Sequence, residues 1–157
     1  MFDCVEVEEE TAKRIKRLNL INNPVKTIKG VQKLVALEAV EIDNIDFVPR
    51  WIEELPAVKK VELRGLKISE LPSWLFAIPT LNDINSWSMK NLRSLDFGSK
   101  PSTNLTKLLL TGCPHLKSLP NDFFAHALEE VDISQNQGGL ISTAPKLLCG
   151  MKGGNRL

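Results

Sequence analysis

Six short runs of apolar residues recur along the chain at a nearly constant interval, and this repetition constrains the fold more than any other feature. Each run places apolar residues at the first, fourth and sixth positions of a unit, except that Ser86 takes one sixth position. The units begin near residues 15, 37, 58, 81, 105 and 128, so successive starts differ by 22, 21, 23, 24 and 23. Such a period is typical of a solenoid, in which each unit buries its apolar residues against its neighbours.

The opening of each unit predicts a short strand, because its fourth and sixth positions alternate with polar ones. The ninth position is expected to point into the coil, where Asn23 and Asn136 can bond the backbone of adjacent turns. Behind the strands, the phrase "VPRWIEELPAV" recurs 23 residues later as "LPSWLFAIPTL". Trp51 and Trp74 share one slot of this phrase, and we expect them to stack on the reverse side as packing residues.

The units "VKKVELRGLKISELPSWLFAIPT" and "LTKLLLTGCPHLKSLPNDFFAHA" resemble leucine-rich repeats over about Ile15 to Leu140. Their leucine-proline pairs and lengths of 21 to 24 residues are similar to the intracellular, Ras-group type, with about six repeats. The resemblance implies an α/β fold, a right-handed solenoid with a short parallel sheet on its concave face and turns and short helical segments on its convex face. It also implies protein recognition as the usual function.

The places where the repeat pattern is lost or altered predict where the caps begin and where the loops are irregular. We expect residues 1–14 to form an N-terminal cap, with a helix that starts at Thr11 or in the acidic run before it. The repeats occupy 15–139, and residues 140–157 are interpreted as a C-terminal cap and flexible tail. Unit two lacks two residues between Phe47 and Val48, which predicts a tighter turn, and unit four has an atypical back half that predicts an irregular loop.

Composition and motifs argue against several classes of function. The net charge of +1 over 157 residues favours neither nucleic acid nor a membrane surface. Three widely spaced cysteines predict neither a disulfide framework nor a metal site, and with no signal peptide or membrane span we expect a cytoplasmic protein. Phosphate-binding and hydrolase motifs are missing. A catalytic pair of Cys113 with a histidine is disfavoured, because the resemblance places that thiol inside the coil, where burial raises the pKa. We therefore expect no enzyme, cofactor or metal.

Outward positions of the strands predict a binding surface on the concave face. Trp87 is the candidate anchor, since an exposed aromatic residue can dominate binding energy. The alternative is that the irregular loop of unit four covers Trp87. The charged residues of this face can contact a partner or simply pair with one another across the strands. The candidate binding residues are Trp87, Leu109, Lys107, Lys59, Arg64, Glu41, Asp43 and Asn85.

The function that follows is a non-enzymatic module, or scaffold, that binds a protein partner on its concave face. An alternative is a regulatory or substrate-recognition subunit of an enzyme complex, such as a ubiquitin ligase or a phosphatase, or a microbial effector. Nucleotide or RNA binding ranks lower, because the two basic clusters are short and interleaved with acids. A homodimer formed through the concave face or a sheet edge is a further alternative.

Overall fold

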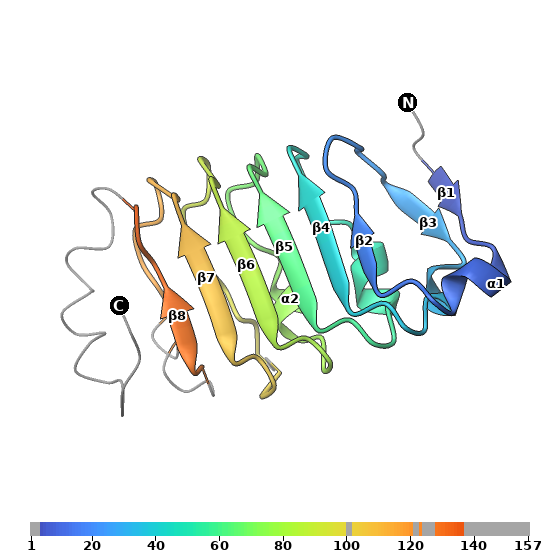
Figure 1. Cartoon of the computed structure of the whole chain (residues 1–157). Helices are drawn as coiled ribbons and strands as arrows, with labels where there is room; N and C mark the ends of the chain where they lie inside the picture. The colour runs from blue at the N-terminus through green and yellow to red at the C-terminus, as the bar shows by residue number, and fades with distance from the viewer. Residues whose placement is uncertain (1–3, 100–101, 121–122, 124–127, 137–157) are drawn as a thin grey trace.

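A parallel sheet of six strands lines one side of the molecule in the computed structural model, which describes residues 4–99, 102–120, 123 and 128–136. The strands follow one another across the sheet in chain order (Figure 1). They are β2 (Arg17–Asn19), β4 (Ala39–Asp43), β5 (Lys60–Arg64), β6 (Asp83–Trp87), β7 (Lys107–Thr111) and β8 (Glu130–Asp132).

The register of these strands follows the repeat. The fourth positions of the units are paired across the sheet, in the order Leu18, Val40, Val61, Ile84, Leu108 and Val131. The four central members of this row are 0% exposed. Because each strand buries every second side chain against the core, the pairing forms one continuous apolar column. The predicted solenoid with a parallel sheet is confirmed.

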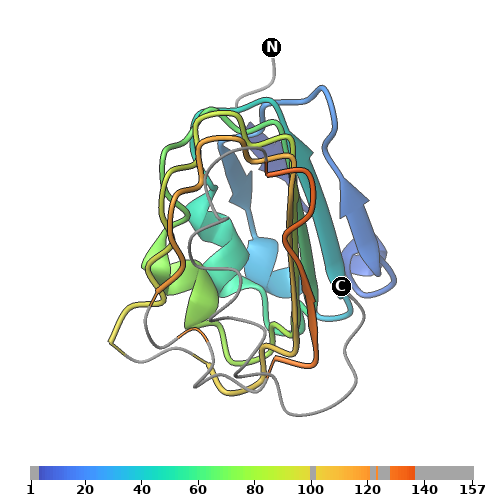
Figure 2. The same ribbon diagram turned by 90° about the vertical axis from the view of Figure 1, so that its left-hand side faces the viewer.

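Short helical segments lie behind the sheet (Figure 2). They are η1 (Val31–Lys33), η2 (Arg50–Glu54) and α2 (Ser73–Phe76). The last two follow Pro49 and Pro72, whose carbonyls accept hydrogen bonds from Ile52 (3.2 Å) and Leu75 (3.0 Å). Proline fixes φ and donates no amide hydrogen, so it suits the start of a helical turn. The repeated phrase therefore folds in the same way twice.

The two tryptophans of that phrase differ in their surroundings. Trp51 is 5% exposed, whereas Trp74 is half-buried. The guanidinium of Arg50 lies 5.3 Å from the centroid of the Trp74 ring. No ring pair between Trp51 and Trp74 occurs among the described residues. The prediction that the two rings stack is wrong, because the cation of the preceding turn occupies the face of Trp74.

Near the N-terminus, β1 (Cys4–Glu6) and β3 (Thr27–Lys29) form a parallel pair beside the β2 end of the large sheet (Figure 1). Between them, α1 (Glu9–Ala12) begins in the acidic run, as predicted, and Ala12 is buried. Acidic residues in the first turn of a helix favour that start, because they complement its positive end. The division of the chain at residue 14 stays a prediction, and the predicted C-terminal cap and tail at 140–157 lie outside the described residues.

Unit four contributes to the core despite its irregular back half. Leu92, Leu95 and Phe97 are all buried. The Phe97 ring meets Phe76 of the preceding unit edge-on at a centroid distance of 4.7 Å and lies 5.8 Å from Phe123 of the following unit. Edge-to-face aromatic contacts of this kind add to the energy of apolar burial. The loop of unit four therefore continues the apolar stacking across three units.

The ninth position behaves as predicted at Asn136 but not at Asn23. The Asn136 amide donates to the carbonyls of Leu110 (2.7 Å) and Ile133 (2.9 Å) and accepts from the Cys113 backbone (2.6 Å). Asn23 is exposed, and its amide donates to the Ile21 carbonyl. The inward prediction is wrong at Asn23, where the chain closes a tight turn through Asn23 N and Leu20 O at 2.8 Å.

The eighth position has a left-handed backbone in every unit, which the sequence interpretation did not anticipate. This conformation turns the chain out of each strand, and Gly or Asn adopts it with little strain. The residues are Asn22, Asn44, Gly65, Ser88, Gly112 and Gln135, with φ between 52° and 65°.

Replacing Gly112 tests the importance of the left-handed backbone at the eighth position. Gly112→Ala is expected to lower the free energy of unfolding by about 1–2 kcal/mol, because alanine is strained at positive φ. Gly112→Asn should cost less, since asparagine holds the same slot at Asn22 and Asn44. A Cβ at Gly112 comes no closer than 3.5 Å to a neighbour, so both variants fit. Urea unfolding measures both, and an equal loss would contradict the explanation.

Ser86 replaces an apolar residue in the centre of the sheet. It pairs with Leu63 and Leu110, is 0% exposed, and its hydroxyl has no hydrogen-bond partner among the described residues. Ser86→Ala is therefore expected to raise the free energy of unfolding by about 1 kcal/mol, because a buried unpaired hydroxyl is destabilising. The exposed Ser99→Ala is the control in urea unfolding. A loss of stability in Ser86→Ala alone would show that the hydroxyl is bonded.

Candidate functional site

The outward positions of the strands form three parallel rows of side chains on the sheet face. Because the strands are in register, each row crosses the sheet with one residue per unit. The third-position row contains Arg17, Ala39, Lys60, Asp83, Lys107 and Glu130. The fifth-position row contains Asn19, Glu41, Glu62, Asn85, Leu109 and Asp132. The seventh-position row contains Asp43, Arg64, Trp87 and Thr111.

The first two rows neutralise one another. Glu62 accepts from Lys60 at 2.6 Å and lies 3.8 Å from the Arg17 guanidinium. Arg17 also contacts Glu41, whose second oxygen accepts from Asn19 at 2.8 Å. Farther along the sheet, Lys107 pairs with Glu130 at 2.8 Å. Lys60 thus pairs most closely with Glu62 of its own strand and lies 3.9 Å from Asp83 of the next strand, while the partner of Glu41 is Arg17.

Two of the predicted binding residues are carboxylates with structural contacts. Glu41 is 8% exposed and Asp43 is 7% exposed. Asp43 accepts from the Asn22 backbone and from the Asn44 amide, both at 2.7 Å. These bonds join neighbouring left-handed turns, so Asp43 holds the edge of the sheet together.

Lys59 and Arg64 lie apart from this network. Lys59 precedes β5 and pairs with Glu38 at 3.2 Å, not with the acids of the sheet face. Arg64 is exposed and forms no ion pair with the described residues. Among the cations of the three rows, Arg64 is therefore the one left for an external carboxylate.

Trp87 lies next to Arg64 in the seventh-position row, with Thr111 on its other side. It is half-buried, and the fifth-position row beside it contains Asn85 and Leu109. The apolar residues of the back half of unit four belong to the buried core. Those residues therefore do not cover Trp87.

A depression of about 750 Å³ continues from this row along the loop edge of the sheet. Arg64, Lys67 and Lys90 line it, together with the Asn44 and Asn91 side chains. Neither Lys67 nor Lys90 forms an ion pair within the described part of the chain. Sequence reasoning missed these lysines, although both hold the tenth position of adjacent units, which was a usable signal.

The predicted absence of a reactive thiol is consistent with the geometry at Cys113. This cysteine is buried, its sulfur lies 3.7 Å from the Thr111 carbonyl, and burial raises the pKa of the thiol. His115 is exposed, and His126 lies outside the described residues. Within the described ranges no cluster of potential metal ligands occurs. None of the helices in those ranges has the length and apolar character needed to cross a membrane.

The surroundings of Asp83 on the sheet face shift the pKa of its carboxyl. Burial raises the pKa of its carboxyl above the ordinary 3.8, and Lys60 and Lys107 only partly oppose this effect. One carboxylate oxygen is buried without a hydrogen-bond partner among the described residues. Between 3.8 and the higher folded-state value, the folded protein binds more protons than the unfolded chain. The free energy of unfolding therefore falls as pH rises through this window.

Replacing Asp83 removes this effect. The stability of Asp83→Asn relative to wild type is expected to increase as pH rises from about 3 to about 7, because asparagine does not ionise. Lys60 retains Glu62 as its partner in the variant. Urea unfolding at several pH values measures the difference, and the exposed Asp46→Asn corrects for the removal of a carboxylate. A relative stability that is constant with pH would contradict the raised pKa.

Comparisons with known proteins agree with this geometry. No model of a known protein family matches the chain. The chain is 28% identical over 131 residues to the TMV resistance protein N of Nicotiana glutinosa, an alignment that covers 78% of the chain and 12% of that protein. It superimposes with a TM-score of 0.61 and 19% identity on the leucine-rich repeat domain of the type III effector XopL, over 82% of this chain and 49% of that one. The chain thus spans less than half the length of either protein. Its in-register parallel strands and this structural match identify it as a leucine-rich-repeat solenoid.

Proposed function

We propose that the chain is a non-enzymatic module that binds a protein partner on the sheet face, with Trp87 as the anchor. The observation that carries this proposal is the position of Trp87, half-buried beside Arg64, which forms no ion pair with the described residues. A large aromatic side chain at such a place can bury much apolar area on contact, while the neighbouring guanidinium can bind a carboxylate.

The charges of the surrounding face support a protein partner. Arg17, Lys60 and Lys107 are all bonded to carboxylates of the same face. A face whose charges are matched internally has little attraction for a polyanion. It still offers a polar rim around an apolar centre, which is the usual composition of a protein interface.

The predicted binding residues then divide into three groups. Trp87, Leu109, Asn85, Lys107 and Arg64 are the proposed contacts, because their side chains lie on the face and retain exposed surface. The proposed role of Glu41 and Asp43 is to hold strands and turns in place, since both are buried. Lys59 lies at the margin, where it would contact only a partner that extends past the strand ends.

A recognition subunit of an enzyme complex or a microbial effector would use the same sheet face. The words "resistance protein" and "effector" describe the two proteins compared above, and the structural likeness extends only to the fold. Within the described part of the chain, no observation favours these roles over that of an independent binding module. Co-purification with a stable enzyme partner would favour them.

Affinity capture tests the anchor. The wild-type chain and a Trp87→Ala variant are used as bait in a lysate of the organism that encodes the chain. Loss of Trp87 is expected to weaken partner recovery at least tenfold, because truncating a central aromatic anchor commonly costs about 2 kcal/mol or more. Trp87→Phe should retain part of the binding.

Val35→Ala is the matched control, since Val35 is a large apolar residue with 54% exposure outside the sheet rows. Thermal unfolding by circular dichroism verifies that each variant is folded. Equal recovery of every partner by wild type and Trp87→Ala would refute Trp87 as the anchor of the sheet face.

A further inference from the structure

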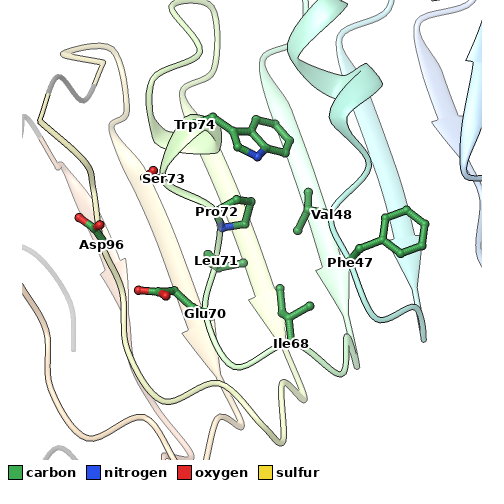
Figure 3. A pocket seen from close by; sticks show the side chains of 9 residues that line it. All are labelled: Phe47, Val48, Ile68, Glu70, Leu71, Pro72, Ser73, Trp74 and Asp96. Carbon is green, nitrogen blue, oxygen red and sulfur yellow. The ribbon is translucent and has the colours of Figure 1, made fainter.

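A second concave surface lies on the reverse side of the coil, between units two and three (Figure 3). This reverse groove encloses about 470 Å³ and is lined by Phe47, Val48, Ile68, Glu70, Leu71, Pro72, Ser73, Trp74 and Asp96. Leu71 and Val48 are buried beneath it, whereas the side chains of Phe47, Ile68 and Trp74 are only half-buried. The groove therefore presents three apolar side chains to a ligand.

The groove follows from the unequal lengths of the two units. In unit two Phe47 is followed directly by Val48, whereas in unit three Ser69 and Glu70 separate Ile68 from Leu71. Beyond this point the units match again, since Pro49 and Pro72 start equivalent helical turns. Ser69 and Glu70 consequently have no equivalent residues beside them in unit two.

The backbone contacts of this segment are consistent with that mismatch. Lys67 donates its amide to the Ile45 carbonyl of unit two at 2.9 Å, immediately before the groove begins. Within the groove segment, Glu70 forms a parallel bridge with Ser94 of unit four. The Ser69 carbonyl also accepts from Arg93 of unit four at 2.8 Å. Unit three is thus held from the unit-four side, while its unit-two side is left open.

The charge of the groove is one-sided. Glu70 and Asp96 lie together on one side of it, across from Phe47 and Val48 (Figure 3). Both carboxylates are exposed, and neither forms an ion pair with the described residues. One oxygen of Asp96 accepts from the Gly98 backbone at 2.8 Å, which fixes the carboxylate and leaves its second oxygen for a ligand.

The cation beside the aromatic wall of the groove forms no ion pair with these carboxylates among the described residues. Arg50 lies over the Trp74 ring and pairs with Glu53 at 2.9 Å. Its position makes one wall of the groove firm, because the guanidinium holds the Trp74 ring against the turn. The groove therefore combines a firm aromatic wall with an unneutralised acidic rim.

We propose that the reverse groove binds an extended peptide segment of a partner protein that presents one bulky apolar side chain next to a lysine or arginine. The apolar side chain lies between Phe47, Ile68 and Trp74, where it is removed from water. The adjacent cation reaches Glu70 and Asp96, which accept its N–H groups. This site is independent of Trp87, because it lies on the opposite side of the core.

A random heptapeptide library displayed on phage provides the probe. It is selected on the full chain and counter-selected on a Glu70→Lys, Asp96→Lys double variant. The selected peptides are expected to combine Lys or Arg with a neighbouring Leu, Ile, Met, Phe or Trp. Affinities of the synthesised peptides are then measured by fluorescence anisotropy. Failure to enrich such sequences would overturn the proposal.

Matched variants locate the binding. The double reversal is expected to weaken a selected peptide about tenfold or more, because it replaces two attractions by two repulsions. A control pair, Glu54→Lys with Glu129→Lys, changes the same net charge at exposed carboxylates outside the groove and should leave the affinity unchanged. Equal weakening by both pairs would show a general charge effect and would overturn the assignment.

Restoring the missing length gives a test that does not depend on charge. Insertion of Ser-Glu between Phe47 and Val48 should fill the groove and abolish peptide binding. Trp87→Ala should leave peptide binding unchanged, so failure of the sheet-face proposal can be told apart from failure of this one. If circular dichroism shows that the insertion variant does not fold, Phe47→Ser serves as the smaller change.

A homodimer of the chain that the Glu70→Lys, Asp96→Lys double variant dissociates would identify a second copy of the chain as the occupant of the groove. That result would overturn the peptide proposal.

Discussion

The structure depends above all on the hydrogen-bonded pairing of each strand with the next at a fixed register. Side chains of a strand alternate between its two faces, so a shift of one residue would move Val61 to the solvent and Lys60 and Glu62 to the core. The buried row through Val40, Val61 and Ile84 excludes that shift. The same pairing places Trp87 beside Arg64, so one constraint determines both the core and the outer face.

Sequence reasoning succeeds where a residue's environment repeats and fails where neighbouring units differ. The apolar period was enough to predict the strands and their register, because the same three positions must be buried in each unit. Trp51 and Trp74 occupy equivalent positions of their units but differ in exposure. The burial of such a side chain depends on the length of the neighbouring unit that packs against it. Asn23 likewise follows the consensus in sequence but lies in a turn with no preceding unit.

Pairing among the charged residues could be predicted in kind but not in detail. The pattern correctly indicated that acids and bases alternate across the sheet face, yet Lys59 pairs with Glu38 and Glu41 with Arg17. Long side chains at a surface can reach several partners, and the energies of exposed pairs differ by less than about 1 kcal/mol. Which partner a charged side chain contacts depends on the position of the backbone and on burial, and neither is specified by the order of residues alone. The left-handed eighth position was missed because Ser88 and Gln135 occupy it as well as Gly and Asn.

The two sides of this solenoid respond to different changes in sequence. On the sheet face the register is constant, so only the identity of the outward side chains can vary. On the reverse side a loop can gain or lose two residues at small entropic cost, and the strands stay in place. Unit two shows the result, because its shorter turn opens the reverse groove while Val40 and Val61 remain paired and fully buried. Because the core lies between the two surfaces, we expect mutations on one surface not to change binding at the other, since the effects of distant sites are usually additive. If both proposed surfaces are occupied, the chain can hold two partners at once without either one altering the binding of the other.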